Sequence, residues 1–213
     1  LEIRIPLHEA GLARHVSPEN LDAWSAYHLG LQHMYRFNRV DNAAAAAPNK
    51  PLTEITEEEW DRCMSVTLRG VWLCLKYELP LIAASGGGAI VNVASLSGMR
   101  GDPHQGAYAS AKGGVLALTK TAATEYARRG VRVNTVCPGG IATKGMEFYL
   151  QDMPQLRQKT LDIHAMGRLA EPAEIADAVV YLCSERASFI TGHDLVVDGG
   201  VLVRSNVIDQ ATL

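Results

Sequence analysis

The chain has 213 residues, a formal net charge of −3 and 47% hydrophobic residues. This length and composition suit one α/β domain with a large core. No run of Lys or Arg exceeds two residues and no apolar run approaches the ~18 residues that span a bilayer. Nucleic-acid and membrane partners are therefore not expected. The first residues also lack the apolar segment of a secretory signal. We expect a cytoplasmic protein that acts on a small molecule.

Regular patterns begin near residue 52. Thr56 and Glu59 have the spacing of a capping box, which predicts the start of a helix. The apolar pattern that follows predicts a long helix over 57–84, and its length suggests a bend. Gly86 to Gly88 end this helix and precede a strand, so we expect a turn there rather than a phosphate-binding loop.

The rest of the chain alternates between strands and helices. The pattern predicts strands at 89–95 and 131–137, a short strand followed by a turn over 194–200, helices at 107–129 and from Pro172 onward, and a loop at 138–143. Gly130 stands where a helix commonly ends. Such alternation is typical of an α/β fold with a doubly wound parallel sheet and helices on both faces, a Rossmann-like three-layer sandwich.

Three polar residues are expected to meet at one edge of this sheet. Ligands of doubly wound sheets lie beyond the carboxyl ends of the strands. Ser95 and the Pro138-Gly139 pair both stand at such ends, and Tyr108 and Lys112 open the helix after the first of them. An isolated Tyr and Lys pair would be an ordinary surface feature of a helix. The convergence of separate features on one sheet edge favours a site.

The chemistry of these three residues suits a carbon–oxygen centre. Tyr108 and Lys112 lie four residues apart, so they share one face of a helix. A cation beside a phenol favours the phenolate, and we therefore expect Lys112 to lower the pKa of Tyr108. The hydroxyl of Ser95 could hold the substrate oxygen.

Several other residues are weaker candidates. Gly139-Gly140 could allow close approach of a ligand or form a plain turn. His104 is expected to be an exposed loop residue, and His164 and His193 to be structural or solvent-facing. An apolar cluster after residue 143 could cover a substrate or pack as a surface helix; its members are Met146, Phe148, Tyr149, Leu150 and Met153. The cysteines are far apart in apolar contexts, which predicts reduced core thiols and no metal site; they are Cys63, Cys74, Cys137 and Cys183.

Over residues ~50–200 the chain resembles the short-chain dehydrogenase/reductase family. The motifs that carry the resemblance are GAIVNVASLSG at 88–98, AYASAKGGV at 107–115, VRVNTVCPGGIAT at 131–143, GRLAEPAEIADAVVYLCS at 167–184 and ITGHDLVVDGG at 190–200. The resemblance implies an NAD- or NADP-dependent oxidoreductase that interconverts a secondary alcohol and a ketone. Dimers or tetramers are usual in this family, so a homo-oligomer is expected.

The resemblance also implies roles for individual residues. Tyr108 would be the general acid/base, Lys112 would lower its pKa and bind the nicotinamide ribose, and Ser95 would bind the substrate oxygen. The residues that would border the nicotinamide and its phosphates are Pro138, Gly139, Ile141 and Thr143. Asn42, in a clipped form of the family's NNAG motif, would also contact the cofactor.

Two features depart from the family pattern. Residues 1–50 lack the glycine-rich turn that holds the pyrophosphate, and Thr67 stands where the family has an active-site Asn. We expect one Rossmann-like domain over 1–213, in which 1–50 is an incomplete cofactor half and 51–213 the catalytic half. Either the protein is shortened or diverged, or the sequence omits stretches of a longer one. A non-catalytic binding or assembly subunit, and an enzyme of the same fold without net redox change, remain alternatives.

Overall fold

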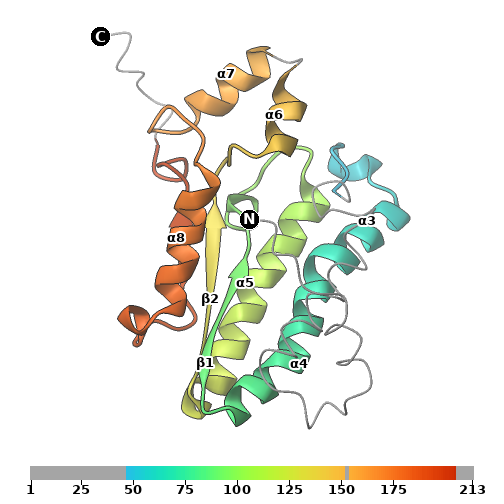
Figure 1. The fold of residues 1–213 in the computed structure, drawn as a ribbon. Helices are drawn as coiled ribbons and strands as arrows, with labels where there is room; N and C mark the ends of the chain where they lie inside the picture. The colour runs from blue at the N-terminus through green and yellow to red at the C-terminus, as the bar shows by residue number, and fades with distance from the viewer. Residues whose placement is uncertain (1–46, 152–153, 205–213) are drawn as a thin grey trace, which may run out of the picture.

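A computed structural model describes residues 47–151 and 154–204 (Figure 1). Asn42 lies outside the described residues, as does most of the expected cofactor half. The helices and strands are α3 (Glu57–Met64), α4 (Gly70–Ala84), β1 (Gly88–Val93), α5 (Gly106–Tyr126), β2 (Val131–Pro138), α6 (Lys144–Gln151), α7 (Pro154–Asp162), α8 (Pro172–Cys183) and β3 (Asp194–Val197). The predicted strands and the helices at 107–129 and from Pro172 are confirmed, although residues 127–129 form a 3-10 turn after α5.

The described strands form a parallel sheet in the order β1-β2-β3. Gly88 pairs with Val131 and Val93 with Val136, so β1 pairs with β2 along the whole length of β1. Helix α8 covers one face of the sheet, while α4 and α5 cover the other (Figure 1). The expected α/β fold, a doubly wound parallel sheet with helices on both faces, is confirmed.

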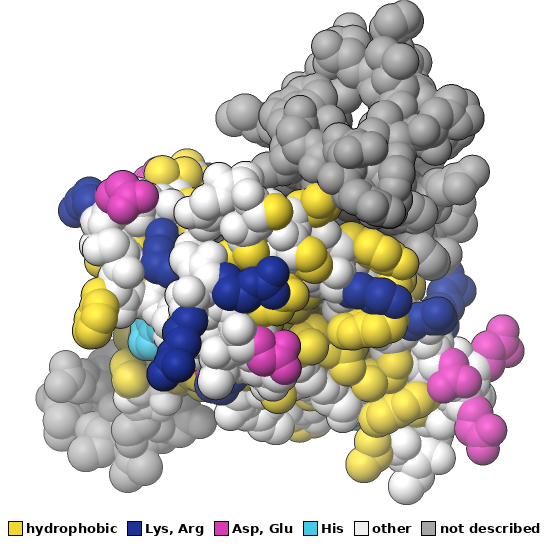
Figure 2. All heavy atoms as spheres, turned by 90° about the horizontal axis from the view of Figure 1, so that it is seen from below, with side chains coloured by type: hydrophobic (Ala, Val, Ile, Leu, Met, Phe, Trp, Pro, Cys, Tyr) yellow, Lys and Arg dark blue, Asp and Glu magenta, His cyan; other side chains and the backbone are white. Residues whose placement is uncertain are grey.

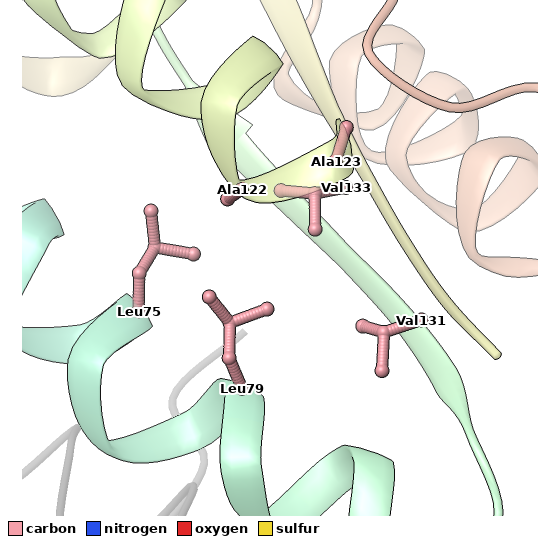
Figure 3. Packing of buried hydrophobic residues seen from close by; sticks show 6 residues of the cluster. All are labelled: Leu75, Leu79, Ala122, Ala123, Val131 and Val133. Carbon is pink, nitrogen blue, oxygen red and sulfur yellow. The ribbon is translucent and has the colours of Figure 1, made fainter. Parts of the chain in front are cut away.

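The central strand explains why the sheet needs both layers of helices. Along β2, successive side chains point to opposite faces, and nearly all of them are buried. Val131 and Val133 pack against α4 and α5, whereas Val136 packs against α8. Figure 3 shows the first of these clusters, in which the side chains from the two helices meet the strand. Its buried members are Leu75, Leu79, Ala122, Ala123, Val131 and Val133.

The helix predicted over 57–84 is present as two α-helices with a differently wound stretch between them. Thr56 accepts the Glu59 N–H at 3.2 Å and Glu59 accepts the Thr56 N–H at 3.0 Å, so the predicted capping box is present. Between α3 and α4 the chain forms a π-helical stretch over Ser65–Arg69. Single π-helical turns interrupt α-helices frequently at functional sites. Thr67 lies in this stretch and is buried.

The glycine predictions are also confirmed. Gly130 adopts the left-handed conformation with φ of 77°, directly before β2. Gly86 and Gly87, with φ of 100° and 107°, form the turn that leads into β1. A Cβ on Gly87 would lie 2.5 Å from the Gly130 carbonyl oxygen, so the close contact between these two turns requires glycine at position 87.

The expectation that all the cysteines are core thiols is wrong for Cys183. All four cysteines are free thiols, but only Cys63 and Cys137 are buried, and Cys183 is exposed at the end of α8.

No helix among the described residues is long and apolar enough to cross a membrane. Seen from below, the molecule presents hydrophobic side chains next to Lys and Arg side chains over much of the visible face (Figure 2).

Candidate active site

Ser95 is held at the carboxyl edge of the sheet by the strand before it. The sheet contact continues one residue past β1, because the Ala94 N–H donates to the Val136 carbonyl at 2.9 Å. Ser95 then opens a short 3-10 helix, η5 (Leu96–Gly98), and its hydroxyl accepts the Ser97 N–H at 3.2 Å. The Ser95 Oγ is thus fixed by a local cap and faces the start of α5.

Tyr108 and Lys112 stand on the first turns of α5, as the sequence predicts. The Lys112 ammonium lies 5.6 Å from the centroid of the Tyr108 ring. It also donates a hydrogen bond of 2.8 Å to the carbonyl of Val93, the last residue of β1. This bond ties the helix to the strand end that carries Ser95. The structure therefore brings Ser95, Tyr108 and Lys112 together at one sheet edge.

The electrostatics of the pair differ from the expectation. Burial raises the pKa of the Tyr108 phenol above its usual value, and a hydrogen bond with the Ser95 side chain opposes that rise. Burial also lowers the pKa of the Lys112 ammonium. The expected lowering of the Tyr108 pKa does not occur in this structure, because burial of the phenol is the largest influence and raises that pKa.

A glycine allows the Ser95 loop to lie directly on α5. A Cβ on Gly98 would lie 2.7 Å from the carbonyl carbon of Lys112 and 2.8 Å from the nitrogen of Gly113. Both atoms belong to the helix backbone, so neither can move independently of α5. Gly98 consequently sets the distance between the loop that carries Ser95 and the turn that carries Lys112. The sequence pattern does not distinguish this glycine from the other glycines of the loop.

We expect Gly98→Ala to disturb the site by pushing these two segments apart. Overpacking of this kind costs about 1–3 kcal/mol, and we expect kcat to fall along with stability. Gly101→Ala is the matched control, because a Cβ there meets no atom within 4 Å. Urea unfolding and steady-state kinetics of both variants are the measurements. Equal stability and kcat for the two variants would contradict the close-approach role.

Thr67 reaches the neighbourhood of the site from the π-helical stretch. Its side chain is 3% exposed. The thiol of Cys63, one turn earlier, lies beside it; burial raises the pKa of that thiol, and its contact with the Thr67 hydroxyl opposes the rise. The Cys63 thiol is therefore the neighbour of the Thr67 hydroxyl in this buried stretch.

The loop after β2 is anchored on two sides. Pro138 is buried at the end of β2, and the Gly139 N–H donates to the Val197 carbonyl at 3.0 Å. Ile141 bridges in parallel to Ala170, just before α8. Thr143 is exposed, and its hydroxyl accepts the Met146 N–H at 3.2 Å, which caps the start of α6. These contacts hold the loop over 138–143 at the same sheet edge as Ser95.

His164 contacts this loop through a hydrogen bond. The sequence did not indicate that His164 is a site residue. It is 2% exposed, and its Nε2 accepts the Gly140 N–H at 3.0 Å. The prediction that His164 is structural is confirmed. The sequence left open whether Gly139-Gly140 allow close approach of a ligand or form a plain turn. Neither describes them fully, because other protein atoms occupy the space that side chains at these positions would need. No sequence signal joins residues 140 and 164, which meet only in the fold.

The remaining candidates fall outside the site or outside the described residues. His104 is exposed, with φ of 66°, as expected of a loop histidine. The His193 N–H donates to the Asn134 side chain, a structural contact. Leu150 of the proposed apolar cover is 2% exposed, so its side chain is buried within the protein. Met153 and the side chains of residues 148–149 are not described.

A serine, tyrosine and lysine at the carboxyl edge of a doubly wound sheet define the site of a Rossmann-type oxidoreductase. The family described as enoyl-(acyl carrier protein) reductase matches residues 28–202. The chain belongs to the short-chain dehydrogenase/reductase family.

Characterised relatives support this membership. The chain is 40% identical to cyclohexanol dehydrogenase of Acinetobacter sp. over 89% of its own length and 73% of that protein's. It is 41% identical to cis-4-hydroxycyclohexanecarboxylate dehydrogenase of Sinomonas cyclohexanicum, over 76% of its own length and 64% of the relative's. A structure of a putative 2-deoxy-d-gluconate 3-dehydrogenase from Agrobacterium tumefaciens with bound NADP aligns with a TM-score of 0.71 and 33% identity, covering 74% of this chain and 64% of that one. The chain thus spans between three fifths and three quarters of these relatives.

The cofactor of this family is NAD or NADP, and the donor groups at the site fit such a cofactor. The Lys112 ammonium and the Tyr108 hydroxyl lie together beside β1. Within residues 138–143, the Ile141 N–H donates to no other described group, which leaves a backbone donor at the same edge. A cation, a phenol and a free amide N–H suit the hydroxyl and amide groups of a nicotinamide nucleotide.

Proposed function

We propose that this protein interconverts a secondary alcohol and a ketone with NAD or NADP, using Tyr108 as general acid/base. The observation that carries the proposal is the meeting of Ser95, Tyr108 and Lys112 at one sheet edge. The nicotinamide supplies or accepts the hydride when bound. The protein residues bind the substrate oxygen, hold the cofactor and move one proton.

Each residue has a distinct part in that proton transfer. In the reduction direction the Tyr108 hydroxyl donates its proton to the oxygen that becomes the alcohol, and in oxidation the phenolate accepts it. The Ser95 hydroxyl, which lies close enough to Tyr108 to affect its pKa, hydrogen bonds the same substrate oxygen. Lys112 holds the sugar hydroxyls of the cofactor and favours the phenolate once it forms. Pro138, Gly139, Ile141 and Thr143 border the nicotinamide end.

The names of the relatives favour a ring-shaped secondary alcohol as substrate. Cyclohexanol dehydrogenase and cis-4-hydroxycyclohexanecarboxylate dehydrogenase are named for oxidation of such alcohols. We therefore propose alicyclic alcohols, with or without a carboxylate, as the first substrates to test.

A cofactor-linked assay tests the proposal directly. The full protein is titrated with NADH and with NADPH while nicotinamide fluorescence is followed, and turnover of cyclohexanol and cyclopentanol is then followed at 340 nm with each oxidised cofactor. Binding of one cofactor with turnover of a cyclic alcohol is the expected result. Failure to bind either cofactor would instead support a non-catalytic binding or assembly subunit. Substrate conversion without change in absorbance would support an enzyme without net redox change.

We also propose that copies of the chain associate, as a dimer or tetramer. Trp72 and Tyr77 on α4 are 42% and 54% exposed, although both are large apolar side chains. A second copy that covers this helix would bury them. Sedimentation velocity of the full protein tests this, and a monomer at micromolar concentration would contradict it. The free thiols favour a cytoplasmic location, and one domain over 1–213 remains the proposed organisation.

A further inference from the structure

His164 has one protonation state that satisfies both of its ring nitrogens. Its Nε2 accepts the Gly140 N–H at 3.0 Å, so that nitrogen carries no proton. Its Nδ1 lies 2.7 Å from the Thr160 carbonyl oxygen, one turn earlier on α7, and must donate to it. The ring is therefore a neutral imidazole with its proton on Nδ1. A buried ring with both nitrogens bonded has a fixed orientation.

The loop after β2 rests directly on this ring. A Cβ on Gly140 would lie 3.0 Å from the imidazole Cε1, and one on Gly139 would lie 3.0 Å from Nε2. The same positions also lie close to other residues: a Cβ on Gly139 would lie 3.0 Å from the Asp198 Cα, and one on Gly140 would lie 2.6 Å from the Leu169 side chain. The two glycines are thus needed so that the backbone can approach His164. The imidazole stands in the place where side chains would otherwise be.

This contact determines which loop amide is available to a ligand. The Gly139 N–H is used by Val197 and the Gly140 N–H by His164. The Ile141 N–H has no partner among the described residues, although the Ala142 N–H just after it donates to Ala170 at 2.8 Å. The bonds on either side therefore hold in place an N–H that has no partner among the described residues, on the loop at the sheet edge where Ser95 and Tyr108 lie.

We propose that His164 is a positioning residue for the nicotinamide cofactor. In its neutral form it holds the Gly140 backbone, so that the loop Pro138–Ile141 has its binding conformation before the cofactor arrives. The gain in affinity comes from preorganisation, because a loop already in place loses less freedom on binding. This inference rests on the proposed function only in taking that loop as part of the cofactor site.

Two substitutions of His164 test its two hydrogen bonds separately, because each keeps one bond and removes the other. In His164→Asn the shorter amide can still donate to the Thr160 carbonyl but does not reach Gly140. In His164→Gln the amide oxygen can reach the position of Nε2 and accept the Gly140 N–H. We expect the Asn variant to bind NADH or NADPH about tenfold more weakly and to raise the KM for the cofactor more than it lowers kcat. The Gln variant should stay within about threefold of the wild type.

Exchange of the Gly140 amide hydrogen gives a readout that needs no cofactor. Measured on the full protein by NMR, this hydrogen should be protected in the wild type and in the Gln variant, and exchange faster in the Asn variant. Thermal unfolding of each variant reports any general loss of stability. If the Asn variant does not fold, the wild type alone decides, because an unprotected Gly140 amide or a proton on Nε2 would overturn the proposal.

The outcomes distinguish this inference from the proposed function. If the wild type binds neither NADH nor NADPH, the proposed function fails whatever the variants do. If the wild type binds a cofactor and the Asn variant binds it equally well, the role of His164 alone is wrong. Equal weakening in the Asn and Gln variants would also overturn it, because the acceptor at Nε2 would then not matter.

Discussion

Replacing Tyr108 by Phe is expected to lower kcat by about 10²–10⁴-fold while leaving the fold and cofactor binding intact. The substitution removes only the hydroxyl that transfers the proton, and the ring can keep its place beside Lys112. Steady-state turnover of a cyclic alcohol with the preferred cofactor is the measurement. A fluorescence titration with the reduced cofactor confirms that binding survives.

Tyr126→Phe is the matched control for this experiment. Tyr126 is the last residue of the same helix, and its substitution by Phe also removes one phenol oxygen. Its ring, however, lies at the far end of α5, 4.7 Å from the Arg129 guanidinium. It should keep wild-type kcat. A Tyr108→Phe variant that retained a tenth or more of the wild-type kcat would exclude Tyr108 as the general acid/base.

The same residue predicts how the rate depends on pH. Burial raises the pKa of Tyr108, so the neutral phenol predominates at pH 7. Ketone reduction needs the neutral phenol and should proceed at pH 7. Alcohol oxidation needs the phenolate and should rise as the pH increases toward the pKa of the phenol. The pH profile of each direction checks this assignment.

Replacing Lys112 by Met is expected to weaken both cofactor binding and proton transfer. A charged donor to a hydroxyl contributes about 1.5–3 kcal/mol, so the Kd for the cofactor should rise by roughly 10–100-fold. Loss of the cation also removes a charge that favours the phenolate. The alkaline rise in alcohol oxidation should therefore move to higher pH. Fluorescence titration and the pH profile of kcat measure the two effects separately.

Lys120→Met controls for the loss of a lysine on the same helix. Lys120 forms an ion pair with Asp194 of β3, and its side chain is 52% exposed. Its removal should cost stability without changing the Kd for the cofactor or the pH profile. If the Lys112 variant behaved like the Lys120 variant, Lys112 would be a structural residue that only joins α5 to the Val93 carbonyl.

Several parts of the fold follow from local patterns in the sequence. Thr56 with Glu59 predicts a helix start, and Gly130 predicts a helix end, because capping depends on residues only a few positions apart. The alternation of strands and helices predicts the parallel sheet, since parallel neighbours need a crossover between them. The spacing of Tyr108 and Lys112 on a helix, after a strand that ends near Ser95, predicts the site.

The tertiary structure decided what depends on burial and on contacts between distant segments. The pKa of Tyr108 is raised rather than lowered, because burial of the phenol comes from packing that residue spacing does not describe. Cys183 at the end of α8 is exposed, whereas its neighbour Leu182 is buried.

The contacts of Gly98 with α5 and of Gly140 with His164 join segments that are 14 and 24 residues apart. In both contacts the backbone of a glycine lies close to other protein atoms. The sequence shows that a glycine is present but not which atoms it lies against. The sequence by itself determined the fold class and the three candidate catalytic residues. Only the tertiary structure showed how glycines and a buried imidazole hold the surrounding loops, because these distances depend on the packing of the whole sheet edge.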